Sequence, residues 1–221
     1  MNEEQTEDRG TWAAPKRSFF TPLNVIVIIA CCIPMGITGA MLSRGASAPR
    51  AIAEAPAFSL TNQRGERVSK ATLKGKVWVG SFLFTHCPDV CPRTLQRLKG
   101  VTGWLAERRP EHQGKVRYVG ISLDHKGDTP ERAKSFLTQQ GHDPKQWDYL
   151  LSDESLHPLM RDGFKLGVRD GQNGLAAAHA DRVVLVGKAG RIRGYYDLNG
   201  NEGIAQLNAH IDLLVKEKLD L

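Results

Sequence analysis

Residues 77–92 read VWVGSFLFTHCPDVCP and join two unlike halves. The first half, residues 77–84, is a nearly continuous apolar run of strand length, the composition of a strand covered on both faces. The second half contains Cys87 and Cys91, and a proline follows each of them. The three residues between the cysteines place both sulfurs about one helical turn apart on the same side of a helix. The stretch therefore predicts a buried strand that leads directly into a helix opened by two thiols.

The residues after this motif predict a βαβ unit. Apolar side chains recur at helical spacing at Leu95, Leu98, Val101 and Leu105, and Pro110 is a stop signal after the last turn. A second apolar strand is predicted at residues 116–123. The sequence Asp128-Thr129-Pro130-Glu131 then combines a capping residue, a proline at the first helical position and an early acid, which opens another helix.

The remaining pattern completes an α/β sheet. The other predicted elements are a hairpin at 58–69, a strand at 147–151, a helix at 156–166, a glycine-containing loop at 167–178, a hairpin at 183–196 and a last helix with Ile204, Leu207, Ile211, Leu214 and Val215 on one face. This order predicts a thioredoxin-like sheet with flanking helices on both faces and the first hairpin as an N-terminal extension. The cysteines then lie at the carboxyl edge of the sheet, where open α/β sheets place their sites.

The front of the chain predicts a membrane anchor. No charged residue occurs from Ser18 to Ser43, and twenty apolar residues in a helix match the ~30 Å hydrocarbon core of a bilayer. A cleaved signal peptide is disfavoured because its apolar stretch is normally shorter. We therefore divide the chain into a short tail (1–20), a transmembrane anchor (21–43), a flexible linker (44–55) and a thioredoxin-like domain (56–221).

The flanks of this segment indicate a location. Acidic residues in the tail, Glu3, Glu4, Glu7 and Asp8, argue against a mitochondrial transit peptide. We expect a single-pass protein of the bacterial inner membrane with its soluble domain in the periplasm. The positive-inside bias is slight, so the orientation depends on the chemistry of the domain. Lipidation of Cys31, in the box-like sequence Ile28-Ile29-Ala30-Cys31, is an alternative.

Charge and cysteine content exclude two classes of protein. The net charge is +6 and the pI about 9.2, but Lys and Arg are spread along the chain without a dense basic run, so we expect no nucleic-acid partner. Of the four cysteines, Cys31 and Cys32 lie in the apolar run. No disulfide scaffold is predicted.

Two thiolates on one side of a helix indicate a soft metal. Such ligands favour Cu(I), zinc or an iron–sulfur cluster. Closed zinc sites and clusters usually take four protein ligands, whereas this domain offers two cysteines, so copper leads. A thiolate at a helix N-terminus is also stabilised by the helix dipole and by unpaired N–H groups.

His179 is the best third ligand among the seven histidines. It ends the 167–178 loop just before the predicted strand at 183, where thioredoxin-like enzymes normally carry a cis-proline, and no proline follows Pro158. Two thiolates and an imidazole resemble the trigonal environment of other copper proteins. We predict one copper, Cu(I) or Cu(II), held by Cys87, Cys91 and His179.

The chain resembles the SCO/SenC family, the copper chaperones of cytochrome c oxidase assembly. The residues that carry the resemblance are Thr85-His86-Cys87-Pro88-Asp89-Val90-Cys91-Pro92, Asp124, Asp128-Thr129-Pro130, and His179 ahead of Val183-Val-Leu-Val. The resemblance implies copper bound by the two cysteines and His179 and transferred to the dinuclear copper site of oxidase subunit II. A periplasmic copper chaperone would be the donor.

Less specific interpretations apply to several neighbouring residues. Asp89 is either a favoured acid in the first turn of a helix or a residue that tunes the thiols. Asp128 is interpreted as a helix cap, and His86 is expected to point away from Cys87 because it is adjacent to it in an extended segment. The other histidines are expected on the surface: His112, His125, His142, His157 and His210.

Two enzymatic functions compete with the chaperone. A thiol–disulfide oxidoreductase would use the same sulfurs to reduce the cysteine pair of an oxidase subunit through a mixed disulfide. A peroxidase related to peroxiredoxins is a weaker alternative, since it needs one cysteine in a pocket that activates it toward peroxide.

Overall fold

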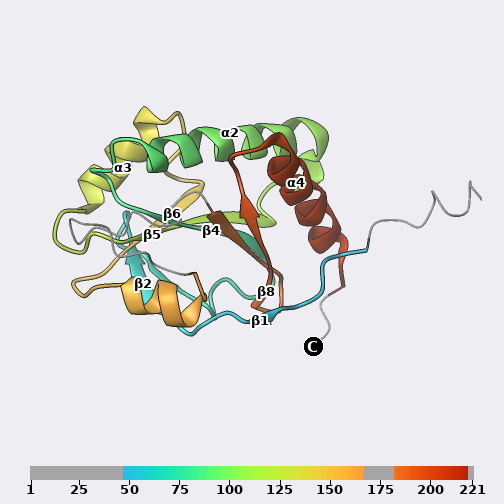
Figure 1. Ribbon diagram of the computed structural model, residues 1–221, viewed down its shortest axis with the longest axis horizontal. Helices are drawn as coiled ribbons and strands as arrows, with labels where there is room; N and C mark the ends of the chain where they lie inside the picture. The colour runs from blue at the N-terminus through green and yellow to red at the C-terminus, as the bar shows by residue number, and fades with distance from the viewer. Residues whose placement is uncertain (1–46, 167–181, 219–221) are drawn as a thin grey trace, which may run out of the picture. The chain divides into compact units, whose positions relative to one another are not determined.

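An eight-stranded mixed sheet forms the centre of the domain (Figure 1). The computed structural model describes residues 47–166 and 182–218. The strand order is β1-β8-β7-β4-β5-β6-β2-β3. The strands are β1 (Ala53–Glu54), β2 (Ser59–Asn62), β3 (Arg67–Ser69), β4 (Val77–Leu83), β5 (Val116–Ser122), β6 (Trp147–Leu151), β7 (Arg182–Val186) and β8 (Arg191–Asp197).

Strand β4 lies between β7 and β5, and all seven of its residues are buried. It pairs in parallel with β5, which pairs in parallel with β6, while β7 is antiparallel to β4. Gly80 in β4 allows close packing, because a Cβ there would meet Val184 Cγ1 at 2.8 Å. The predicted buried strand that ends in the cysteine motif is confirmed.

Three α-helices cover one face of this sheet (Figure 1). They are α2 (Val90–Arg108), α3 (Pro130–Gln139) and α4 (Asn201–Lys216). Their buried side chains share one core with Val77, Val79 and Leu83, the alternate residues of β4. The predicted helices after the cysteine motif, after residue 129 and at the C-terminal end are confirmed.

The second face of the sheet is covered by a shorter helical segment than the sequence predicts. Its core contains Trp78 and Phe82 of β4, packed edge to face against Phe164. The helix predicted at 156–166 is shorter in the structure: residues 157–163 are helical, and Leu159–Gly163 forms a π-helical turn. A Cβ on Gly163 would meet the Pro56 ring at 2.8 Å, so this segment is fixed by close packing. The three α-helices therefore flank one face of the sheet, and this short helical segment flanks the other (Figure 1).

The N-terminal hairpin extends the sheet at its other edge. Strand β2 is antiparallel to both β3 and β6. Asp148 of β6 is almost fully buried and accepts hydrogen bonds from Arg64 at 2.6 Å, from Arg117 at 2.5 Å and from Asn62 at 2.9 Å. Paired in this way, the buried carboxylate fixes the hairpin to the sheet.

The first described residues are already part of the sheet. Strand β1 pairs with β8, the Ile52 N–H donates to the Ile192 carbonyl at 2.8 Å, and Ala55 is buried. The hydrogen-bonded domain therefore begins inside the segment predicted as a linker (44–55). Within residues 47–166 and 182–218, no helix combines the length and apolar character needed to cross a bilayer, and the predicted anchor lies outside these ranges.

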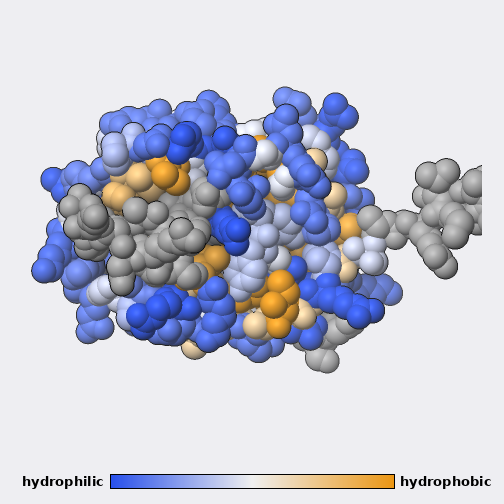
Figure 2. All heavy atoms as spheres, in the orientation of Figure 1, coloured by the Kyte–Doolittle hydropathy of each residue, from blue (hydrophilic) through white to orange (hydrophobic). Residues whose placement is uncertain are grey.

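The visible surface is mainly hydrophilic, with a few small hydrophobic areas (Figure 2). Together, the mixed sheet and its flanking helices confirm the predicted thioredoxin-like α/β fold.

Candidate metal centre

The connection from β4 to α2 carries both cysteines of the motif. The Cys87 N–H donates to the Phe84 carbonyl at 3.2 Å, which turns the chain directly after β4. Helix α2 begins at Val90, so Cys87 precedes the helix and Cys91 lies in its first turn. Asp89 makes no side-chain cap and instead pairs with Arg93 at 2.9 Å, where both side chains are exposed. Asp89 is thus a solvated acid at the start of the helix.

The two cysteines are free thiols in contact with one another. Cys91 is fully buried and Cys87 partly so, and the Cys91 N–H donates to Cys87 Sγ at 3.3 Å. The Cys91 S–H also donates to the Cys87 sulfur, and this is the largest cause that lowers the Cys87 pKa to about 6. Backbone N–H groups of residues 89–91 lower it further against the opposing effect of burial. Cys87 is therefore mainly a thiolate at neutral pH.

Cys91 has the opposite character. Its hydrogen bond to Cys87, together with burial, raises the Cys91 pKa well above its ordinary value. One proton is thus shared by the pair and lies on Cys91. Such a pair can bind a soft metal ion once that proton is lost, or attack a disulfide through the partly exposed Cys87.

Asp128 supports the motif from the neighbouring strands. Its carboxylate accepts from the Thr85 N–H at 2.8 Å and the Thr85 hydroxyl at 2.6 Å, from the Ser122 hydroxyl at 2.7 Å and from the Tyr149 hydroxyl at 2.9 Å. The prediction that Asp128 caps a helix is wrong, because Thr129 is the N-cap of α3 and accepts from the Arg132 N–H. Asp128 instead lies in the loop before α3 and joins Thr85 of the cysteine motif to β5 and β6.

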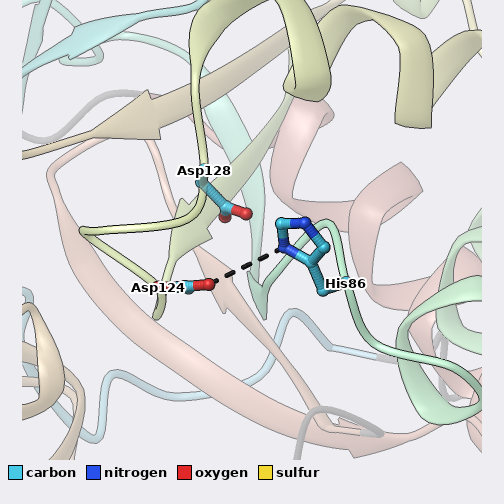
Figure 3. Close-up of side chains that lie close together, drawn as sticks. All are labelled: His86, Asp124 and Asp128. Atoms are coloured by element: carbon cyan, nitrogen blue, oxygen red, sulfur yellow. Dashed lines mark ion pairs between the residues drawn. The ribbon is translucent and has the colours of Figure 1, made fainter.

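His86, Asp124 and Asp128 form a second group of polar side chains (Figure 3). One ligand atom of each lies within 4.8 Å of the others, and His86 Nδ1 is 3.8 Å from Asp124 Oδ2. The imidazole is half exposed and faces the carboxylates of the loop after β5. Since the Asp128 carboxylate is already hydrogen-bonded four times, its position is explained without a metal ion.

The histidine predictions have different outcomes. His179 lies outside the described residues, so its distance from the sulfurs stays a prediction. The surface prediction is wrong for His112 and His142, which are buried. His112 Nε2 lies 2.8 Å from Asp212, and His142 Nε2 lies 2.8 Å from the Leu95 carbonyl oxygen. Both histidines thus make a structural hydrogen bond through Nε2, and within the described residues the buried Nδ1 of His112 has no hydrogen-bond partner.

Comparison with known proteins gives consistent matches. The SCO1/SenC family model matches residues 46–215. The SCO1 protein homolog of Bacillus subtilis is 28% identical over 151 residues, which cover 67% of this chain and 75% of that protein.

Two solved structures show the same fold. A SCO1/SenC family lipoprotein from Bacillus anthracis aligns with a TM-score of 0.67 and 26% identity, covering 76% of this chain and 99% of that one. Bradyrhizobium japonicum ScoI, solved with copper bound, aligns with a TM-score of 0.57 and 27% identity, covering 72% and 99%.

Proposed function

This chain belongs to the SCO1/SenC family, and we propose that it is a metallochaperone that binds one copper ion through Cys87, Cys91 and His179. Its acceptor would be the dinuclear copper site in subunit II of cytochrome c oxidase, and its donor a periplasmic copper chaperone. The observation that carries the proposal is the contacting pair of free thiols at the end of β4. Copper is bound in the solved Bradyrhizobium relative, which supports the choice of metal.

The donor set fits a copper cargo. Cys87 offers a thiolate at neutral pH, and a metal ion that binds both sulfurs displaces the remaining proton from Cys91. Soft sulfur ligands select Cu(I), while an added imidazole also suits Cu(II). Because the motif lies at an edge of the sheet and Cys87 is partly exposed, a partner protein can reach the site.

We also propose that residues 21–43 anchor the chain in the bacterial inner membrane, with the domain in the periplasm. The supporting observation is the length of the uncharged apolar segment in the sequence. Such an anchor would confine copper delivery to acceptors in the same membrane.

A thiol–disulfide oxidoreductase is the second candidate, and the unequal thiols favour it. The Cys87 thiolate would attack a substrate disulfide, forming a mixed disulfide and releasing one substrate thiolate. Cys91 would then lose its proton and attack Cys87. The substrate leaves with two thiols, and the Cys87–Cys91 disulfide retains the oxidising equivalents.

One set of variants separates the two functions. Cu(I) and Cu(II) are titrated into the reduced protein, and stoichiometry and sulfur-to-copper charge-transfer absorption are recorded for Cys87→Ala, Cys91→Ala and His179→Ala. His86→Ala is the matched control, because its imidazole faces the carboxylates of the loop after β5. We expect one copper per chain in the parent and in His86→Ala. Neither Cys87→Ala nor Cys91→Ala should bind copper stably, and His179→Ala should bind it more weakly.

The same variants are assayed for reduction of a model disulfide. Reductase activity that is kept in His179→Ala but lost in both Cys87→Ala and Cys91→Ala would favour the thiol–disulfide oxidoreductase. Copper affinity unchanged by His179→Ala would contradict the three-ligand site.

A further inference from the structure

The two ends of the sheet differ in charge. Strands β4, β5 and β6 run in the same direction, and their carboxyl ends lead to the cysteines. The amino ends of β4 and β5 define the opposite end of the domain. We call this opposite end the basic pole, and it comprises residues 49–55, 70–77, 108–116, 187–193 and 212–218.

Hydrogen bonds join these segments into one surface. The Gly75 N–H donates to the Lys188 carbonyl at 2.8 Å, and the Val77 N–H donates to the Lys115 carbonyl at 3.1 Å. The Lys188 ammonium donates to the Val215 carbonyl at 2.6 Å. These bonds make the loop before β4, the loop before β5, the β7–β8 turn and the end of α4 neighbours.

The first described residues belong to the same surface. Arg193 donates to the Pro49 carbonyl at 2.5 Å and to both oxygens of Glu217 at 2.8 Å. In Figure 1, β1 lies near the last turn of α4. The chain therefore enters the domain within the basic pole.

The basic pole carries a large excess of positive charge. Its segments contain twelve Lys and Arg residues against four acids, a formal excess of eight positive charges. The cations are Arg50, Lys70, Lys74, Lys76, Arg108, Arg109, Lys115, Lys188, Arg191, Arg193, Lys216 and Lys218, and the acids are Glu54, Glu111, Asp212 and Glu217.

The cysteine end has the opposite sign. We define the cysteine rim as residues 84–89, 122–131, 151–156 and 196–202, the described loops at the carboxyl ends of β4, β5, β6 and β8. These segments contain eight acids and one lysine. The net charge of +6 for the whole chain thus conceals a basic end and an acidic end.

An exposed apolar side chain lies on the same basic surface. Ile52 is 60% exposed and is the one large hydrophobic residue found exposed among residues 47–166 and 182–218. It follows Arg50 and precedes β1. A cationic surface with a protruding aliphatic group combines the two features that hold proteins at a lipid interface.

We propose that the basic pole rests on the surface of an anionic phospholipid bilayer and so turns the cysteine rim away from the membrane. The proposal rests on the proposed anchor at residues 21–43. Five residues separate position 43 from Pro49, and an extended chain over those six steps spans at most about 20 Å. The basic pole is thereby kept close to the headgroups, and anionic lipids would repel the acidic cysteine rim.

The test uses the full chain in lipid nanodiscs, without copper. Discs of phosphatidylcholine alone are compared with discs that also contain phosphatidylglycerol, and backbone hydrogen exchange is measured for the loops at 70–76 and 187–191. We expect slower exchange of both loops in the anionic discs, reversed at about 0.5 M salt, where charges are screened. The loops of the cysteine rim should exchange equally in both discs.

Charge reversal identifies the surface. Lys74→Glu with Lys115→Glu changes two exposed residues of the basic pole, and Lys126→Glu with Lys134→Glu makes the same change of charge elsewhere on the exposed surface. Each lysine near an anionic surface contributes about fivefold to docking. The first pair should therefore abolish the lipid-dependent protection and the second should keep it.

Three results would overturn the proposal: equal exchange in both kinds of disc, protection of the cysteine rim, or equal loss in both double variants. Because no readout involves copper, these failures are distinct from a failure of the metallochaperone proposal. If the chain does not stay in the discs, the anchor itself is wrong.

Discussion

Replacing Cys91 by alanine should raise the pKa of Cys87. In the parent, the Cys91 S–H is the largest cause that holds the Cys87 pKa at about 6, and backbone N–H groups of residues 89–91 add to it. A hydrogen bond to a charged acceptor is worth about 1.5–3 kcal/mol, which corresponds to about one to two pKa units. We expect the lower part of this range, because Cys87 is partly exposed and water screens its charge.

Alkylation of Cys87 measures this shift as a function of pH. The thiolate is the reactive form and is lost as the pH falls through the pKa, so the rate should rise with a midpoint near 6 in the parent. In Cys91→Ala the midpoint should lie at about 7. Peptide mass spectrometry separates Cys87 from Cys31 and Cys32. The midpoints are compared and not the absolute rates, because a thiolate of lower pKa is also less nucleophilic. This loss partly offsets the gain in rate from the larger thiolate fraction.

Cys91→Ser is the matched control, since its hydroxyl can still donate to the Cys87 sulfur. Its midpoint should stay closer to that of the parent than the midpoint of Cys91→Ala. A parent midpoint near the ordinary thiol value of about 8.5 would refute the reasoning. So would a midpoint that does not change when Cys91 becomes alanine.

Three stability predictions concern the frame around the thiols, each measured by urea unfolding of the reduced protein. Asp128→Asn should lower the free energy of unfolding by about 2–4 kcal/mol, because the NH2 group of the new amide must face some of the four donors. A loss below about 1 kcal/mol would contradict the structural role given to this carboxylate. Asp148→Ala should lower the free energy of unfolding by about 2–4 kcal/mol, since two arginines lose a buried partner. An unchanged urea midpoint would show that other contacts hold the hairpin on the sheet. Gly80→Ala should cost about 1–3 kcal/mol because its Cβ would overlap Val184 and Trp78, whereas equal stability would mean that these side chains can move aside.

Local patterns in the sequence predicted the elements that position the thiols. The apolar run at 77–84 has the composition of a strand buried on both faces, and β4 is buried throughout. The strand predicted at 147–151 matches β6, and Pro130 begins α3 as predicted. In each case residues that are close in sequence determine the structure.

Long-range contacts account for the errors. Asp128 has a residue type suited to helix caps, but its partners Thr85 and Tyr149 lie 43 and 21 positions away. His112 is buried, and its imidazole contacts Asp212, which lies 100 positions further along the sequence. The apolar spacing at 156–166 predicted a longer helix, but the helical segment ends at Gly163 and Phe164 packs into the core of the second face of the sheet. The two-residue strand β1 is too short to give a pattern.

The most direct test of the copper site is X-ray absorption spectroscopy of the protein loaded with one equivalent of Cu(I). The proposed site predicts two sulfur ligands and one nitrogen ligand in the first shell, with the nitrogen lost in His179→Ala and retained in His86→Ala. A first shell with fewer than two sulfurs, or a nitrogen that remains when position 179 is alanine, would contradict a site built from Cys87, Cys91 and His179.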